Sequence, residues 1–103
     1  MSIPLNVLNQ VFELQQKING LPDAPSFERN FNRLFTLFEE EGYLLQNPLQ
    51  EVYTESRTDC EASIVGQPSS KMKITKVLKP AIYQKTEARL QLVQKAVVIV
   101  EKM

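Results

Sequence analysis

The chain has 103 residues with 12 basic and 12 acidic side chains, so its formal net charge is zero. This balance argues against nucleic acid as a partner, because nucleic-acid-binding proteins need a clustered positive surface. Histidine is absent and Cys60 is the single cysteine, which removes the commonest general base, the commonest metal ligand and any internal disulfide. The composition therefore predicts one small globular protein that is not an enzyme, uses no metal or cofactor, and acts by binding.

The sequence predicts no targeting or membrane segment. Residues 1–11 lack the basic stretch and apolar core of a secretory signal. The longest uninterrupted apolar run, residues 96–100, is far shorter than the roughly 20 residues of a membrane-spanning helix. We therefore expect no membrane association and a cytoplasmic location, where an unpaired cysteine stays reduced.

A first helix is predicted over about residues 3–19. Apolar residues recur on one face at spacings of three and four: Leu5, Leu8, Val11, Phe12 and Ile18. Asn19 and Gly20 are expected to end it, since both accept the left-handed conformation that closes helices.

A second helix is predicted from about residue 27, after a short connection. Pro25 fits its first turn, and Asp23 or Ser26 can cap it. Its apolar stripe is regular and comprises Phe27, Phe31, Leu34, Phe35 and Phe38. Gly42 follows the expected end of this helix. The short connection predicts an antiparallel helical hairpin.

Short strands are predicted after Gly42, where the helical period disappears. The candidates are residues 43–45, 60–65, 72–78, 82–83 and 90–100, of which the last is the longest. The polar segment 47–59 is typical of a loop. Helices followed by strands predict an α+β fold with a small, mainly antiparallel β domain.

Two groups with potential chemistry are interpreted as structural. Cys60 lies between Asp59 and Glu61, whose charges raise a thiol pKa, so we interpret it as a small buried residue. The three carboxylates of residues 39–41 occupy successive helical positions that point in different directions, so they are interpreted as a solvated helix end rather than a metal site.

Four lysines, Lys71, Lys73, Lys76 and Lys79, admit two interpretations. They could form a positive stripe for an acidic partner, or a solvated strand edge that resists aggregation. In a regular strand Lys71 and Lys73 share a face, whereas Lys76 and Lys79 do not share one with each other. We therefore favour the strand edge.

The helices carry more apolar surface than a hairpin can cover, since Val7 and Leu14 lie off the main face of the first helix. We expect a second copy to cover it, as a homodimeric four-helix bundle, with a monomer as the alternative. Residues 1–42 are then the dimerisation hairpin and residues 43–103 a partner-binding β head. The predicted dimer interface comprises Leu8, Val11, Phe12, Phe27, Phe31, Leu34 and Phe35.

Four segments of the β region resemble, in their order, the head domain of GrpE-type nucleotide exchange factors, the co-chaperones of DnaK-type heat-shock proteins. The segments are FEEEGYLL (38–45), DCEASI (59–64), ITKVLKPAIY (74–83) and LVQKAVVIV (92–100). The two predicted helices are similar to the short helices of the family's dimeric bundle. The family's long N-terminal paired helix has no counterpart in this sequence.

The resemblance implies a co-chaperone of protein folding and the stress response that works without catalysis. Its β head would bind the ATPase domain of a DnaK-type chaperone, favour an open nucleotide cleft and so speed ADP release. Gly42 would orient the head relative to the helices. The residues implied in partner binding are Glu61, Lys79, Tyr83, Arg89, Gln94 and Lys95, whereas Ile64, Leu78 and Val98 are expected in the core.

A second hypothesis is a protein with the same fold but without exchange activity. Gln91 and Gln94 stand where the family's closing motif has basic residues, and Lys95 stands where it has proline. The alternative is therefore a dimeric adaptor that serves another protein. A small enzyme is the third hypothesis and the least favoured, because no nucleophile–base pair can be assembled.

Overall fold

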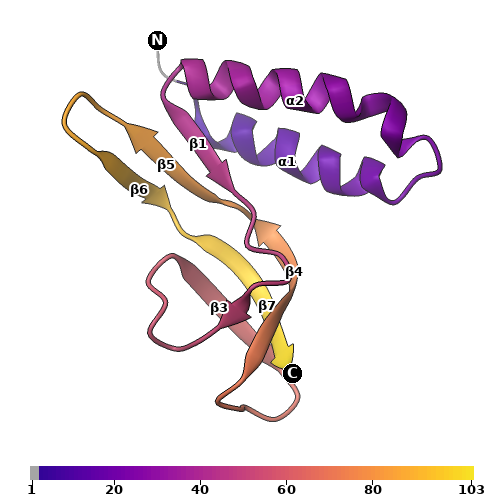
Figure 1. The fold of residues 1–103 in the computed structure, drawn as a ribbon, viewed down its shortest axis with the longest axis vertical. Helices are drawn as coiled ribbons and strands as arrows, with labels where there is room; N and C mark the ends of the chain where they lie inside the picture. The colour runs from indigo at the N-terminus through magenta and orange to yellow at the C-terminus, as the bar shows by residue number, and fades with distance from the viewer. Residues whose placement is uncertain (1–2) are drawn as a thin grey trace.

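The structure, a computed structural model, describes residues 3–103 as two helices followed by seven strands in two sheets (Figure 1). The helices are α1 (Leu5–Asn19) and α2 (Ala24–Glu40). The strands are β1 (Tyr43–Gln46), β2 (Val52–Tyr53), β3 (Cys60–Val65), β4 (Met72–Lys79), β5 (Ala81–Lys85), β6 (Leu90–Gln94) and β7 (Ala96–Lys102). This is a small α+β fold.

The helix ends follow from local chemistry, with one difference from expectation. Pro25 lies in the first turn of α2, where its missing N–H costs nothing. Gly20 closes α1 with a φ of −82°, an ordinary right-handed conformation rather than a left-handed one. Gly42, between α2 and β1, has a φ of 93°, which glycine adopts far more easily than residues with a Cβ.

The strands form two sheets that share one long, bent hairpin. The first sheet has the order β1-β5-β6 and the second the order β2-β4-β7-β3. Pro80 separates β4 from β5 and Lys95 separates β6 from β7, so each arm of the hairpin passes from one sheet to the other. The single strand predicted over residues 90–100 is therefore two strands. The short β2 lies within the predicted loop 47–59, and β3 pairs with β7 in parallel.

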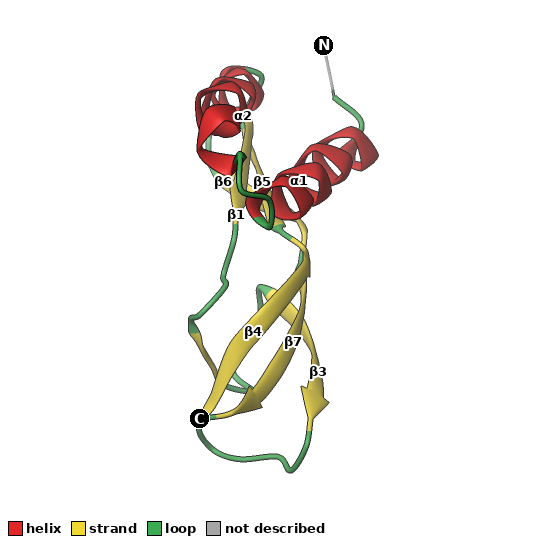
Figure 2. Cartoon of the chain, turned by 90° about the vertical axis from the view of Figure 1, so that its right-hand side faces the viewer, coloured by secondary structure: helices red, strands yellow, loops and turns green. Residues whose placement is uncertain are grey.

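The molecule is flat and open for its size. Its extents are 43 × 41 × 17 Å and its radius of gyration is 14.8 Å, against about 12.8 Å for a compact domain of this length. Its accessible surface is 7185 Å², against roughly 5,900 Å² expected from its mass. Figure 2 shows the helices at one end of the molecule and strands β3, β4 and β7 at the other.

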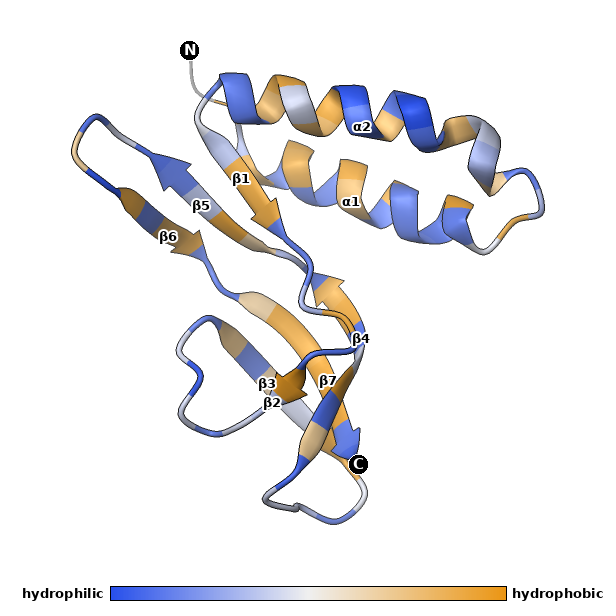
Figure 3. Cartoon of the chain, viewed as in Figure 1, coloured by the Kyte–Doolittle hydropathy of each residue, from blue (hydrophilic) through white to orange (hydrophobic). Residues whose placement is uncertain are grey.

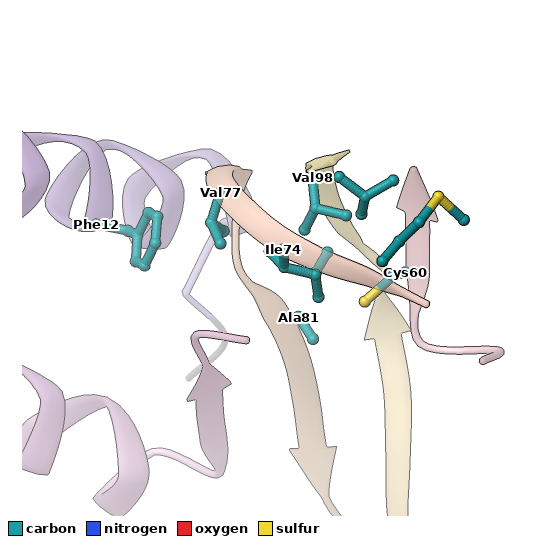
Figure 4. Close-up of a cluster of buried hydrophobic side chains, with 9 residues drawn as sticks. Phe12, Cys60, Ile74, Val77, Ala81 and Val98 are labelled. Atoms are coloured by element: carbon teal, nitrogen blue, oxygen red, sulfur yellow. The ribbon is translucent and has the colours of Figure 1, made fainter. Parts of the chain in front are cut away.

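Two apolar clusters hold these two ends. In the first cluster, Leu8 of α1 and Phe38 of α2 pack with Tyr43 and Ile82 of the first sheet. The second cluster fills the inner face of the second sheet. Its buried members are Phe12, Cys60, Met72, Ile74, Val77, Ala81, Ala96, Val98 and Val100. Figure 4 shows Phe12, which comes from α1, beside Val77 of β4.

The predicted four-helix bundle is wrong, because the chain from residue 3 onward has two helices and its own strands cover their apolar faces. Leu8, Phe12 and Phe31 are only 0%, 3% and 5% exposed within the single chain. Val11, Leu34 and Phe35 are half-buried, and Phe27 is exposed. The first two residues of the predicted dimerisation hairpin lie outside the described residues.

The core expectations are correct for Val98, which is 1% exposed, and wrong for Ile64 and Leu78, which are 41% and 49% exposed. Ile64 lies on β3, the outermost strand of the second sheet, so it has a neighbouring strand on one side only. Leu78 lies at an irregularity of β4, between Val77 and Lys79, where the alternation of inward and outward side chains is interrupted.

Candidate functional site

The outer face of the second sheet, opposite the apolar cluster, carries a group of charged residues. Its centre is β7, whose alternate residues Ala96, Val98 and Val100 are buried. Side chains alternate along a strand, so Val97 and Ile99 lie on the outer face, where they are half-buried. Figure 3 shows β7 as mostly hydrophobic before its hydrophilic end.

Strand β4 aligns three lysines beside this apolar column. Lys79 is opposite Val97, Lys76 opposite Ile99 and Lys73 opposite Glu101. Their partners are alternate residues of β7, so all three lysines lie on the outer face. The expectation that Lys76 and Lys79 lie on different faces is therefore wrong.

The physical reason is a pair of register shifts in β4, between Ile74 and Lys76 and between Val77 and Lys79. Each shift inserts one extra residue into β4. Lysines that are three positions apart in β4 therefore lie opposite residues that are two positions apart in β7, and so they share a face. Consecutive lysines are thus roughly 6.8 Å apart along the sheet. Strand β2 pairs with β4 only at Met72 and Lys73, so β4 is an inner strand at Lys73, and for Lys76 and Lys79 the strand-edge interpretation stays a prediction.

Strand β3 completes the face on the other side of β7. Glu61 is opposite Val97 and Ser63 is opposite Ile99. One row therefore runs from Lys79 through Val97 to Glu61, with a positive end, an apolar centre and a negative end. We call the surface formed by Lys73, Lys76, Lys79, Val97, Ile99 and Glu61 the lysine face.

The other residues that the resemblance marks for partner binding lie away from this row, except one. Lys95 is exposed two residues before Val97, at the end of the β7 column. Tyr83 is half-buried in β5. Arg89 belongs to the turn between β5 and β6, where its carbonyl accepts a hydrogen bond of 2.9 Å from the N–H of Thr86. The structure therefore brings Glu61 and Lys79 together across Val97, places Lys95 just before the start of β7 and leaves Arg89 in the turn at the far end of the first sheet.

Gln94 is engaged within the chain. Its amide exchanges two hydrogen bonds of 2.8 Å with Asn9 of α1. Its Nε2 also donates to the carbonyl of Pro80 at 2.9 Å. This side chain therefore joins α1 to the bend of the hairpin and is half-buried there.

A second polar cluster surrounds Arg57, in the segment that the sequence pattern predicted as a plain loop. The guanidinium donates to both carboxylate oxygens of Asp59, at 3.0 and 2.9 Å, and to the carbonyl of Val52 at 3.1 Å. It also donates to Glu51 at 3.1 Å. Arg57 thus ties β2 to the start of β3, and the sequence signal was the Arg-x-Asp spacing directly before a strand.

This cluster adjoins the single cysteine, whose electrostatics are determined chiefly by burial. Cys60 is buried, and burial raises the pKa of its thiol, while the charge of Arg57 opposes that shift. The hydrogen bond from Arg57 lowers the pKa of Asp59. A thiol with a raised pKa is a poor nucleophile at neutral pH, so the geometry supports a packing role for Cys60 as the sequence predicts.

The described residues contain no group of three or more acidic or cysteine side chains placed to hold a metal ion. Among residues 3–103, neither helix is long and apolar enough to cross a membrane. No protein-family model matches the chain, and comparison with curated proteins and with solved structures finds no match either. Function is therefore inferred from the residues and their geometry.

Proposed function

We propose that this protein is a GrpE-like co-chaperone that binds the ATPase domain of a DnaK-type chaperone through the lysine face and promotes ADP release. The identity of the partner is inferred from the sequence resemblance. The observation that carries the proposal is the row Lys79–Val97–Glu61, because it places two of the residues that the resemblance marks on one face, across three strands.

The lysine face has the composition of a protein-binding surface. Three exposed or half-exposed lysines lie on one side of two half-buried apolar residues, and the exposed Glu61 lies on the other side. This arrangement suits a partner surface with acidic groups opposite the lysines, an apolar centre and a basic group opposite Glu61. Complementary charge of this kind speeds association and fixes orientation. The mechanism requires tighter binding to the open than to the closed chaperone, and that difference shifts the population towards the open cleft.

The test is release of a fluorescent ADP from the DnaK-type chaperone of the same source, followed with and without this protein. We expect faster release at micromolar protein. Lys79→Glu should reduce the effect at least tenfold, because it places an acid opposite the partner's acids. Lys17→Glu on α1 is the matched control, since it makes the same charge change away from the lysine face. An unchanged release rate together with no complex would overturn the proposal.

A second candidate, the adaptor without exchange activity, is favoured by Gln94. The resemblance marks this residue for partner contact, but its amide is held by Asn9 and by the carbonyl of Pro80. Arg89 is also remote from the lysine face. A stable complex with the chaperone that leaves ADP release unchanged would identify the protein as an adaptor.

A further inference from the structure

Strand β6 is the outer strand of the first sheet, and one of its sides is open. The direction of its backbone groups follows from its neighbour β5. The N–H of Lys85 donates to the carbonyl of Gly42 at 2.7 Å, towards β1. Lys85 is opposite Leu90, so the backbone groups of Leu90 point away from β5. By alternation, Leu92 also presents its N–H and C=O at the open edge.

This edge lacks the usual protection by charge. Its five residues, Leu-Gln-Leu-Val-Gln, are uncharged and contain no proline. Leu90 is 51% exposed. Edge strands of monomeric proteins commonly carry lysine or proline to prevent pairing with another chain. The charges lie outside the strand, on Arg89 and Glu87 at one end and on Lys95 at the other.

We infer that β6 pairs with β6 of a second copy, antiparallel, about a two-fold axis at Gln91. In this register Leu90 is opposite the partner's Leu92, and the open backbone groups of both residues form hydrogen-bonded pairs. A register centred on Leu92 would instead place Leu90 opposite the partner's polar Gln94.

The side chains favour the same register. Leu92 is opposite Tyr83 and Leu90 is opposite Lys85, so both leucines lie on one face of the sheet. Two copies bring four leucines together at the axis on that face. On the other face Gln91 meets the partner's Gln91, where two amides can exchange hydrogen bonds. The contact is isologous and closed, and it converts two three-stranded sheets into one of six strands.

This contact uses neither the helices nor the lysine face, so it is independent of the proposed function. The contact is one pair of five-residue strands, which is small for a protein interface, so we expect a weak dimer. The lysine faces of both copies remain open for a partner in such a dimer.

Sedimentation of the full chain over a series of concentrations from micromolar to millimolar tests the contact. We expect a monomer–dimer equilibrium that Gln91→Lys weakens at least tenfold, because it places two positive charges at the axis. Gln84→Lys is the matched control: Gln84 is opposite Gln91 on β5, one strand away from the edge, so the dimer should persist. The thermal midpoints of both variants report that they remain folded.

Amide exchange adds a residue-level measurement: the N–H groups of Leu90 and Leu92 should gain protection as concentration rises, whereas that of Gln91 is already bonded to β5. A chain that is monomeric throughout, or a dimer that Gln91→Lys leaves unchanged, would overturn the inference.

Discussion

The apolar face of the sheet is covered in different ways in the two halves of the molecule. The first sheet, β1-β5-β6, carries both helices on one face, where Leu8 and Phe38 pack on Tyr43 and Ile82. The second sheet, β2-β4-β7-β3, encloses its own cluster with the help of the segment tied by Arg57. The first half leaves a strand edge open, and the second leaves the lysine face.

The boundary between the two halves also differs from the point in the sequence where the helical pattern gives way to the strand pattern. That change occurs at Gly42, between helices and strands, but Phe12 of α1 belongs to the cluster of the second sheet. Leu45 of β1 packs against both clusters. The hairpin arms pass through both sheets as well. Changes at the connections between the halves should therefore have the largest effects.

Phe12→Ala is expected to have the largest effect, about 3–5 kcal/mol of unfolding free energy, through lost burial and a cavity. Phe12 is 3% exposed and links α1 to the second sheet. Urea unfolding measures the loss. Leu14→Ala is the control on the same helix, since Leu14 is 52% exposed, and it should stay within about 0.5 kcal/mol. Equal losses in the two variants would contradict the placement of α1.

Gly42→Ala is expected to destabilise by about 1–2 kcal/mol, because alanine at a φ of 93° is strained. The added Cβ would also lie 3.4 Å from the carbonyl of Lys85. Thermal unfolding measures the shift. Gly20→Ala is the control, since Gly20 has a φ of −82° and alanine adopts that conformation freely. A larger loss at Gly20 than at Gly42 would show that the turn after α2 is misplaced.

Local patterns predicted most elements of this fold. The helices follow from apolar spacing within α1 and α2, and β3 follows from the alternation of Cys60, Ala62 and Ile64. These signals depend on neighbours within a few residues. The break at Lys95 and the short β2 were missed, because both depend on which distant strand lies alongside.

The candidate site also could not be predicted from local sequence patterns alone. The lysines were visible in the sequence, but their common face depends on two bulges that exist only through the pairing of β4 with β7. Likewise, the helix faces predicted a second copy because nothing in the sequence showed that the strands return beneath Leu8 and Phe12. Long-range pairing, rather than local propensity, decides both questions.

Asp59→Asn tests how the second half is closed, with an expected loss of about 1 kcal/mol near neutral pH because the pair with Arg57 is partly exposed. The folded pKa of Asp59 lies below its ordinary value, so the unfolded chain binds the proton more readily. The stabilisation is complete above the unfolded pKa of about 3.9 and is lost as the pH falls through the folded pKa.

Urea unfolding between neutral and acidic pH measures this effect. The variant should show a flatter decline below about pH 4 than the parent chain. Glu51→Gln is the control, since Glu51 makes one bond to the same guanidinium but is 53% exposed in its side chain, and it should change the profile less. Identical acid profiles in parent and Asp59→Asn would contradict the role of the Arg57 cluster.

Leu78→Ser is expected to have the smallest effect, within about 0.5 kcal/mol, as for surface substitutions generally. Leu78 is 49% exposed, whereas the adjacent Val77 is 9% exposed, so Val77→Ser should cost several times more. The contrast depends on the register shift between Ile74 and Lys76, because regular alternation from Ile74 would place Lys76 and Leu78 on the inner face and Val77 on the outer face. If Leu78→Ser were as costly as Val77→Ser or more so, β4 would lack that shift. Lys73 and Lys76 would then lie on opposite faces, and the lysine face would not exist.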